Sequence, residues 1–192
     1  MIELINISKK YGEKVAVSDF SYKFTNKLYQ ITGKNGAGKS VLLRIIAGIE
    51  KPDSGRVSSS IDGSRILFLT DNGIGLPFLS IIDNIFLSAK LLDIHIEKSD
   101  FFTLFANDEV LLNSEYKSSS LGNQMKVGLA LLFADAKFDL IIIDEALNGV
   151  DRQSEKMILN KVKSLSDNTP VILVSHNTLI EKESGTVTIV DI

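Results

Sequence analysis

The chain contains no cysteine and no tryptophan, and only three prolines and two histidines, among its 192 residues. Without cysteine it can form no disulfide or thiolate metal site, and it has no thiol nucleophile. The two histidines, His95 and His176, lie far apart in the sequence, which disfavours an imidazole metal cluster. No apolar run reaches the ~18 residues of a membrane-spanning helix, and the start MIELINISKKYG lacks the pattern of a signal peptide. These absences predict a cytoplasmic chain.

The charge and apolar content limit the class of protein further. The net charge is −3, whereas nucleic-acid surfaces depend on clustered Lys and Arg, so we expect no nucleic-acid partner. Apolar residues make up 44% of the chain. This is enough to bury a sizeable core in one compact domain that can carry an inserted subdomain.

A glycine-rich loop is the first chemical motif. Residues 29–48, YQITGKNGAGKSVLLRIIAG, predict a strand, a loop and a helix, and they fit G-x-x-x-x-G-K-[ST]. In this motif backbone N–H groups close around phosphates at a helix N-terminus. Lys39 is expected to reach the β and γ phosphates and Ser40 to hold Mg²⁺. The predicted ATP-binding residues here are Gly33, Asn35, Gly36, Ala37, Gly38, Lys39, Ser40 and Val41. The motif alone leaves kinases, GTPases, helicases and transporter ATPases open.

Two acids follow the second motif, an apolar run from Leu140 to Ile143. Such a run predicts a strand that is buried on both faces of a parallel sheet. Ligands of these sheets lie beyond the carboxyl ends of the strands, so we expect Asp144 to hold Mg²⁺ and Glu145 to act as general base. In isolation, a solvated acidic turn is the alternative.

A third apolar run, Val171 to Val174, precedes Ser175 and His176. A lone histidine after a strand is more often a turn or cap residue than a catalytic one. Its combination with the other two motifs favours a sensor of the γ-phosphate.

The stretch SSLGNQMKVG, residues 119–128, opens a predicted helix. Ser120 lies at the N-cap position, with Gly122 and Asn123 as turn residues in the simplest interpretation. Helical spacing predicts one buried face over residues 125–136. The residues of this face are Met125, Gly128, Leu129, Leu132, Phe133 and Ala136.

In order, the segments KKYGEK, the phosphate loop, a helical insertion, SSLGNQMKV, LIIIDEALNGVD and VILVSH resemble the ABC-type ATPases over essentially the whole chain. The resemblance implies an α/β fold: a P-loop NTPase core with a mixed or parallel sheet, an N-terminal antiparallel β region and an inserted helical subdomain. Residues 1–72 and 137–192 would form the nucleotide-binding core, and about 73–136 the helical signature subdomain. It also implies ATP and Mg²⁺ as cofactors and ATP hydrolysis coupled to transport.

The same resemblance assigns roles to further residues. Tyr11 would stack on adenine. Ser120, Gly122 and Asn123 belong to the signature, which in this family faces the ATP of a partner domain, and Gly149-Val150-Asp151 matches the loop that joins the two subunits. A chain with one phosphate loop and one signature would therefore work with a second ABC ATPase subunit, as a homodimer or a heterodimer.

Several positions depart from the family pattern. Val41 replaces a threonine, Ser119 a leucine and Asn123 a glutamine of the signature. Asp71 aligns with the glutamine that senses Mg²⁺, and Asn72 is an alternative if the register shifts by one. We expect Asp71 to face the metal.

Residues 76–92, LPFLSIIDNIFLSAKLL, resemble the start of the helical subdomain, with a capping pattern at Ser80 and Asp83. The nearby phenylalanines form the core of that subdomain or a groove for a permease helix. The leading hypothesis is a transporter ATPase of a compact, bacterial exporter-like type, bound to permease subunits at the cytoplasmic face of the membrane. The alternatives are a soluble ATP-dependent switch and a weakly hydrolysing regulatory subunit.

Overall fold

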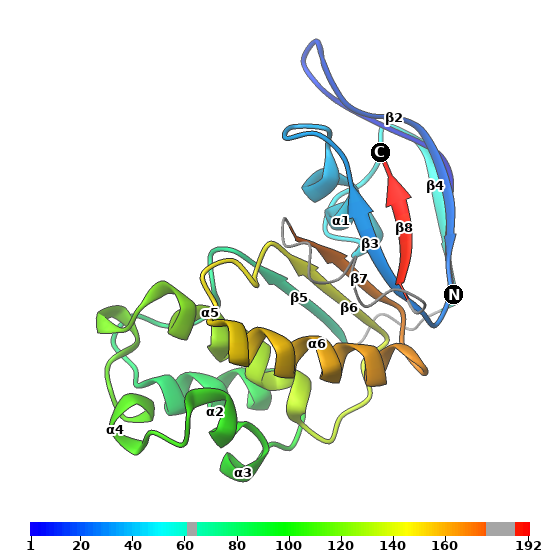
Figure 1. The fold of residues 1–192 in the computed structure, drawn as a ribbon. Coiled ribbons are helices and arrows are strands. Elements are labelled where there is room, and N and C mark those ends of the chain that lie inside the picture. The colour runs from blue at the N-terminus through cyan, green and yellow to red at the C-terminus, as the bar shows by residue number, and fades with distance from the viewer. Residues whose placement is uncertain (61–64, 176–186) are drawn as a thin grey trace. The chain divides into compact units, whose positions relative to one another are not determined.

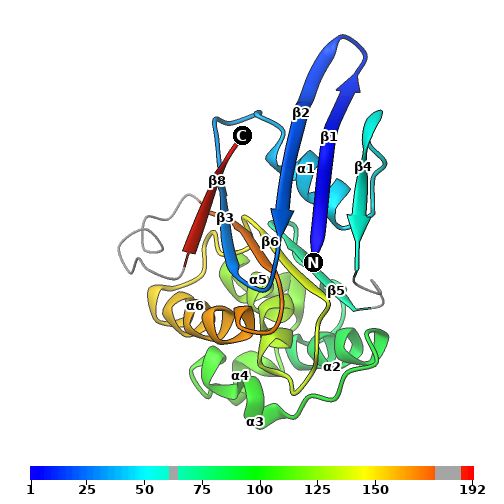
Figure 2. The same cartoon turned by 90° about the vertical axis from the view of Figure 1, so that its right-hand side faces the viewer.

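The computed structural model describes residues 1–60, 65–175 and 187–192, which form two compact units. Unit 1 comprises Met1–Phe68, Phe138–Asp144 and Leu165–Ile192, and unit 2 comprises Leu69–Lys137 and Glu145–Ser164. Figure 1 labels most of their elements, and Figure 2 also labels β1. None of the helices in these described ranges is both long enough and apolar enough to span a bilayer.

Unit 1 begins with a three-stranded antiparallel sheet in the order β2-β1-β4, whose strands lie side by side in Figure 2. Ile2, Leu4 and Ile7 of β1 are buried, and the residues between them are more exposed. This pattern places one face of the strand on a core. The strands are β1 (Ile2–Tyr11), β2 (Lys14–Phe24) and β4 (Ser54–Ser59).

The second sheet has five strands in the order β5-β6-β7-β3-β8. Strand β3 runs parallel to β7 and β8, and β6 runs parallel to β7. Every residue of β6 and β7 is buried, as the continuous apolar runs predict for central parallel strands. The strands are β3 (Leu28–Thr32), β5 (Ile66–Thr70), β6 (Leu140–Asp144), β7 (Val171–Val174) and β8 (Val187–Asp191). The predicted α/β class, with an antiparallel β region and a parallel sheet, is confirmed.

Helix α1 (Lys39–Ile46) packs between the two sheets of unit 1. Its buried residues Leu42, Leu43 and Ile45 join one core cluster with side chains from β1, β3, β6 and β7. Because both sheets contact this short helix, its N-terminus is held firmly at the end of the loop that follows β3.

Unit 2 is helical. Ser80 caps α2 by accepting a hydrogen bond from the backbone of Asp83, which confirms the predicted helix start. Phe101 and Phe105 are fully buried, whereas Phe78 is 71% exposed, so the phenylalanines serve both as core and as surface. The helices are α2 (Ile81–Leu91), α3 (Lys98–Phe101), η1 (Phe102–Phe105), α4 (Glu109–Leu112), η2 (Tyr116–Ser118), α5 (Leu121–Ala130), η3 (Leu131–Phe133) and α6 (Arg152–Ser166), the last of which ends in unit 1.

The prediction of one helical face over residues 125–136 is wrong at its C-terminal end. Helix α5 stops at Ala130, continues as the 3-10 turn η3, and reaches extended backbone at Ala134. Leu129 to Leu132 are all buried, so this segment is enclosed on every side and has no solvent face. Spacing of apolar residues cannot locate a helix end in such a segment.

Candidate functional site

The glycine-rich loop joins β3 to α1 and packs tightly against β2. Gly38 is the N-cap of α1, with a φ of 97°, in the left-handed region that favours glycine. A Cβ atom at Gly38 would lie 1.9 Å from the backbone oxygen of Ala16. Alanine cannot fit there unless backbone moves, so this close approach fixes the course of the loop.

Lys39 lies inside the loop. Its side-chain nitrogen donates hydrogen bonds to the backbone oxygens of Gly33 (2.9 Å) and Lys34 (3.1 Å), and the residue is only 8% exposed. Within the part of the chain that the structure describes, no side chain caps the N-terminus of α1, while Ser40 in its first turn is exposed. The Lys39 ammonium and the uncapped backbone N–H groups therefore lie together at the N-terminus of α1, which is a suitable arrangement for binding phosphate.

Asp144 is the last residue of β6 and is 7% exposed. It pairs in register with Val174 of β7, and Leu173 of β7 pairs with Gln30 of β3. The parallel strands β6 and β3 thus end at the same edge of the sheet, separated by two strand spacings, or about 10 Å. The glycine-rich loop, which follows β3, and Asp144, which ends β6, therefore lie at this shared edge of the sheet.

Glu145, the next residue, belongs to unit 2 and has a left-handed backbone with a φ of 59°. A non-glycine residue in this conformation costs about 1–3 kcal/mol, so the contacts of the surrounding turn must hold it there. The turn that follows is closed by a hydrogen bond from the Asn148 backbone N–H to the Glu145 oxygen (3.0 Å). The Asn148 side-chain amide also donates to the Glu145 carboxylate (3.3 Å).

The N-terminus of α5 carries the predicted signature residues. Ser120 is the N-cap, as its position predicts, and its hydroxyl oxygen accepts a hydrogen bond from the Asn123 backbone at 3.3 Å. A Cβ atom at Gly122 would lie 2.2 Å from the backbone oxygen of Gly149. Only a glycine lets the first turn of α5 approach the 145–151 loop this closely.

Sequence reasoning missed an ion pair that joins these two segments. The Lys126 side chain is 8% exposed, and its nitrogen lies 2.5 Å from the Asp151 carboxylate. Burial alone would raise the pKa of Asp151, but hydrogen bonds from Lys126 and Ser154 outweigh burial and hold this pKa well below its usual range. No short motif indicates the pair, because its members come together only when α5 packs in unit 2.

Comparison with known proteins identifies the family. A family model described as "ABC transporter" matches residues 18–148, more than half of the chain. The chain belongs to the ABC transporter family.

Curated relatives of this chain are ATP-binding proteins of import and export systems. The zinc import ATP-binding protein ZnuC of Rickettsia conorii is 30% identical over 92% of this chain and 76% of its own length. The capsule polysaccharide export ATP-binding protein CtrD of Neisseria meningitidis is 30% identical over 92% of this chain and 83% of its own length. The chain is thus an ATP-binding subunit of an ABC transporter and an ATPase. Because importers and exporters match alike, these names do not favour the exporter-like type.

Solved structures of low sequence identity share the fold. An ABC transporter ATP-binding protein from Pyrococcus furiosus has a TM-score of 0.79 at 22% identity, covering 99% of this chain and 96% of its own. A bacterial ABC transporter cassette solved as a dimer has a TM-score of 0.80 at 21% identity, covering 100% and 94%. These likenesses support the ABC cassette fold over the whole chain.

Tyr11 is the last residue of β1. It is 47% exposed, so its ring is accessible. Its hydroxyl donates a hydrogen bond to Glu50 and accepts one from Arg44 at 3.5 Å. The hydrogen bond from Tyr11, assisted by Arg44, lowers the pKa of Glu50. The sequence pointed to Tyr11 but not to the two residues that hold it. Its role in stacking on adenine stays a prediction.

The remaining predicted residues have separate outcomes. Asp71 and Asn72 are both exposed in a turn that the Gly73 backbone N–H closes onto the Thr70 oxygen (3.3 Å). Exposure does not distinguish the two, so the choice between them stays open. His176 lies outside the described residues.

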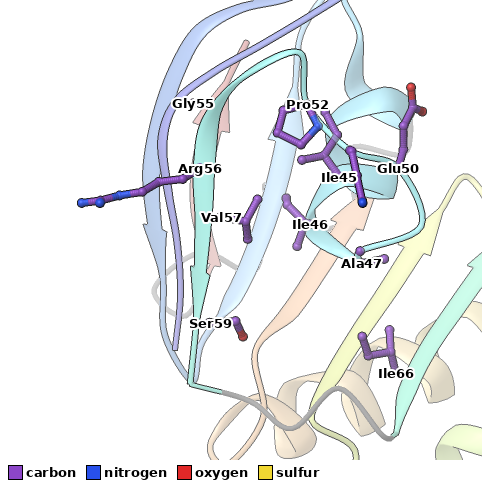
Figure 3. Close-up of a pocket in the computed structure, with 12 residues that line it drawn as sticks. Ile45, Ile46, Ala47, Glu50, Pro52, Gly55, Arg56, Val57, Ser59 and Ile66 are labelled. Atoms are coloured by element: carbon purple, nitrogen blue, oxygen red, sulfur yellow. The ribbon is translucent and has the colours of Figure 1, made fainter.

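An open pocket of about 580 Å³ in unit 1 is distinct from the phosphate loop (Figure 3). It lies at the C-terminal end of α1, where Ile46, Val57 and Ile66 line it, while Arg56 points away from it. The phosphate loop is at the other end of the helix, a full helix length of about 12 Å away. This pocket therefore does not include the phosphate-binding part of the candidate ATP site, although its lining contains Glu50, the partner of Tyr11.

Proposed function

We propose that Lys39 and the N-terminus of α1 bind the ATP phosphates, that Ser40 and Asp144 hold Mg²⁺, and that Glu145 takes the proton of the attacking water. The observation that carries this proposal is the Lys39 ammonium held inside the loop beside uncapped N–H groups. One exposed hydroxyl and one carboxylate suit Mg²⁺, which usually takes one or two protein oxygens and completes its shell with phosphates and water. When bound, Mg²⁺ would neutralise charge on the phosphates.

We further propose, from the family resemblance, a core of residues 1–72 and 137–192 and a signature subdomain of about 73–136. In this scheme Val41 and the other loop residues enclose the phosphates, and His176 senses the γ-phosphate. Asp71 is assigned to the metal.

A second copy or a related subunit would complete each ATP site. Ser120, Gly122 and Asn123 stand at the N-terminus of a helix with no acidic residue in its first turn, which favours an anion. The carboxylates of the hydrolytic site lie elsewhere in the sequence, at the end of β6. We propose that this signature turn contacts the ATP of the partner domain, so that the working unit is a dimer, homomeric or heteromeric.

A permease is the proposed membrane partner, and it would hold the chain at the cytoplasmic face of the membrane. The loop before α2 exposes Ile74, Leu76 and Phe78. It is nevertheless well anchored, because the buried Asn84 side chain accepts a hydrogen bond from the Leu76 N–H (2.6 Å) and donates one to the Leu76 oxygen (3.1 Å). An ordered apolar loop can bind a partner helix with little loss of conformational entropy.

The decisive experiment on the chemistry is Glu145→Gln, measured for ATP binding, hydrolysis and oligomeric state. The amide removes the base while the proposed phosphate contacts remain, so hydrolysis should fall by about 100-fold or more with ATP affinity retained. Light scattering with saturating MgATP should then find dimers. Monomers of a chain that binds ATP would contradict a homodimeric site and direct the search to a different ATPase subunit. Wild-type hydrolysis by the variant would remove Glu145 from the mechanism.

The permease proposal is tested by Phe78→Asp in cells that express the whole transporter. The variant should no longer co-purify with the membrane subunit, whereas its ATP affinity should match that of the wild type. Val110→Asp is a matched control, since Val110 is also exposed, on α4 of the same unit. Equal co-purification of both variants would show that the loop before α2 is not the docking site.

A further inference from the structure

The turn from Glu145 to Asn148, which follows β6 in the chain, has a defined shape within unit 2. Its two central residues, Ala146 and Leu147, are 2% and 1% exposed, so they anchor the turn in unit 2. The left-handed backbone of Glu145 and the hydrogen bond from the Asn148 N–H to the Glu145 oxygen (3.0 Å) define its shape. The backbone of the turn that carries the Glu145 side chain is therefore fixed.

A glutamate side chain still has three rotatable bonds, so a fixed backbone does not by itself place its carboxylate. In this turn the Asn148 side-chain nitrogen lies 3.3 Å from Oε2 of Glu145 and donates a hydrogen bond to it. Both residues are half-buried. An asparagine amide is suited to this task, because it donates to a carboxylate and neither gains nor loses a proton.

We propose that Asn148 is a positioning residue for ATP hydrolysis, which holds the Glu145 carboxylate in the orientation that receives the proton of the attacking water. The inference rests on the proposed role of Glu145 as general base. Asn148 acts only through Glu145 and needs no contact with ATP. A general base contributes about 10²–10⁴-fold to a rate only when its oxygen is placed correctly, so a misplaced carboxylate forfeits part of this factor.

Two substitutions probe the hydrogen bond. Asn148→Ala removes the donor and should lower kcat by about 10-fold. Asn148→Asp keeps the shape of the side chain but places a second carboxylate beside that of Glu145. Because like charges at this separation repel, this variant should lower kcat by at least about 30-fold. In both variants the KM for MgATP should stay within about twofold of the wild-type value, because the groups proposed to bind the phosphates are unchanged.

Asn113→Asp is the matched control. Asn113 is exposed at the end of α4, and its side-chain amide also donates a hydrogen bond, to the backbone oxygen of Glu109 (2.7 Å). The control should keep the wild-type kcat. Melting temperatures of all variants, measured on the same preparations, separate loss of positioning from loss of the folded turn.

A double mutant shows whether Asn148 acts on hydrolysis through Glu145. In single-turnover measurements, Asn148→Asp added to Glu145→Gln should cause no further slowing, because the carboxylate that Asn148 positions is already absent. A wild-type kcat in both Asn148 variants, beside a slow Glu145→Gln enzyme, would overturn the inference alone. A fast Glu145→Gln enzyme would instead overturn the proposed base. A raised KM, an equal loss in the Glu145→Gln background, or a loss of activity that follows the melting temperature would each assign Asn148 a different role.

Discussion

The ion pair between Lys126 and Asp151 joins α5 to the start of α6, and Asp151→Asn tests what it contributes to stability. The two charged groups are 2.5 Å apart, and the side chains are 8% and 54% exposed. At this separation the Coulomb attraction is about 7 kcal/mol at an effective dielectric near 20 and about 2 kcal/mol at a dielectric near 80. Because solvent screens the half-exposed carboxylate, the lower figure applies.

We therefore expect Asp151→Asn to lower the free energy of unfolding at pH 7 by about 2 kcal/mol, or the melting temperature by about 4–8 °C for a chain of this size. The exposed Asp135 lies in the same unit, and Asp135→Asn controls for loss of one negative charge. Thermal unfolding followed by circular dichroism measures both variants.

The pH dependence of this difference provides a second check. The folded pKa of Asp151 is lowered, so its stabilising contribution is fully present above the unfolded pKa of about 3.9 and is lost as the pH falls through the folded pKa. The gap in stability between the wild type and Asp151→Asn should thus be constant from pH 7 to about 5 and narrow below about 4. Equal melting temperatures for Asp151→Asn and Asp135→Asn at pH 7, or a gap that does not change in acid, would refute the reasoning.

Further predictions concern the phosphate loop, the signature and Asp71. Lys39→Ala should weaken MgATP binding by about 100-fold or more in calorimetry, because the loop loses the cation held inside it; unchanged affinity would contradict the site. Gly38→Ala should lower the melting temperature by several degrees, about 1–3 kcal/mol of overpacking, because its Cβ would lie 1.9 Å from a backbone oxygen. Ser120→Arg should abolish ATPase activity while ATP binding to the same chain persists; full activity with a stability loss of about 1 kcal/mol would leave Ser120 only its capping role. Asp71→Gln should raise the Mg²⁺ concentration that half-maximal ATPase activity requires, and an unchanged Mg²⁺ titration would leave Asn72 as the candidate.

Local patterns predicted the parts of the fold that depend on local chemistry. The helix starts at Ser80 and Ser120 were predictable, because an N-cap needs only a hydroxyl and the backbone of the next turn. The buried strands β6 and β7 were predictable because parallel sheets require continuous apolar runs. The phosphate loop, the signature and the strand that ends in two acids also follow one another in the order of a known family.

Contacts between distant segments were not predictable in the same way. Lys126 looks like an ordinary polar residue of an amphipathic helix, and only the packing of unit 2 buries it beside Asp151. Glu50 and Arg44 likewise acquire a role only when β1 brings Tyr11 beside them. The end of α5 escaped prediction because residues buried on every side have no periodicity.

The close approach of Gly38 to β2 places unequal demands on two positions of the sequence. Ala16 takes part through its backbone oxygen, so any residue that keeps the strand conformation can stand there. Gly38 has no such freedom, because the Cβ atom of any other residue would overlap with that oxygen. A saturation-mutagenesis map would therefore score position 16 as tolerant and position 38 as intolerant, although both form the same contact. Methods that infer contacts from paired substitutions would miss this one, since neither residue can compensate for a change in the other.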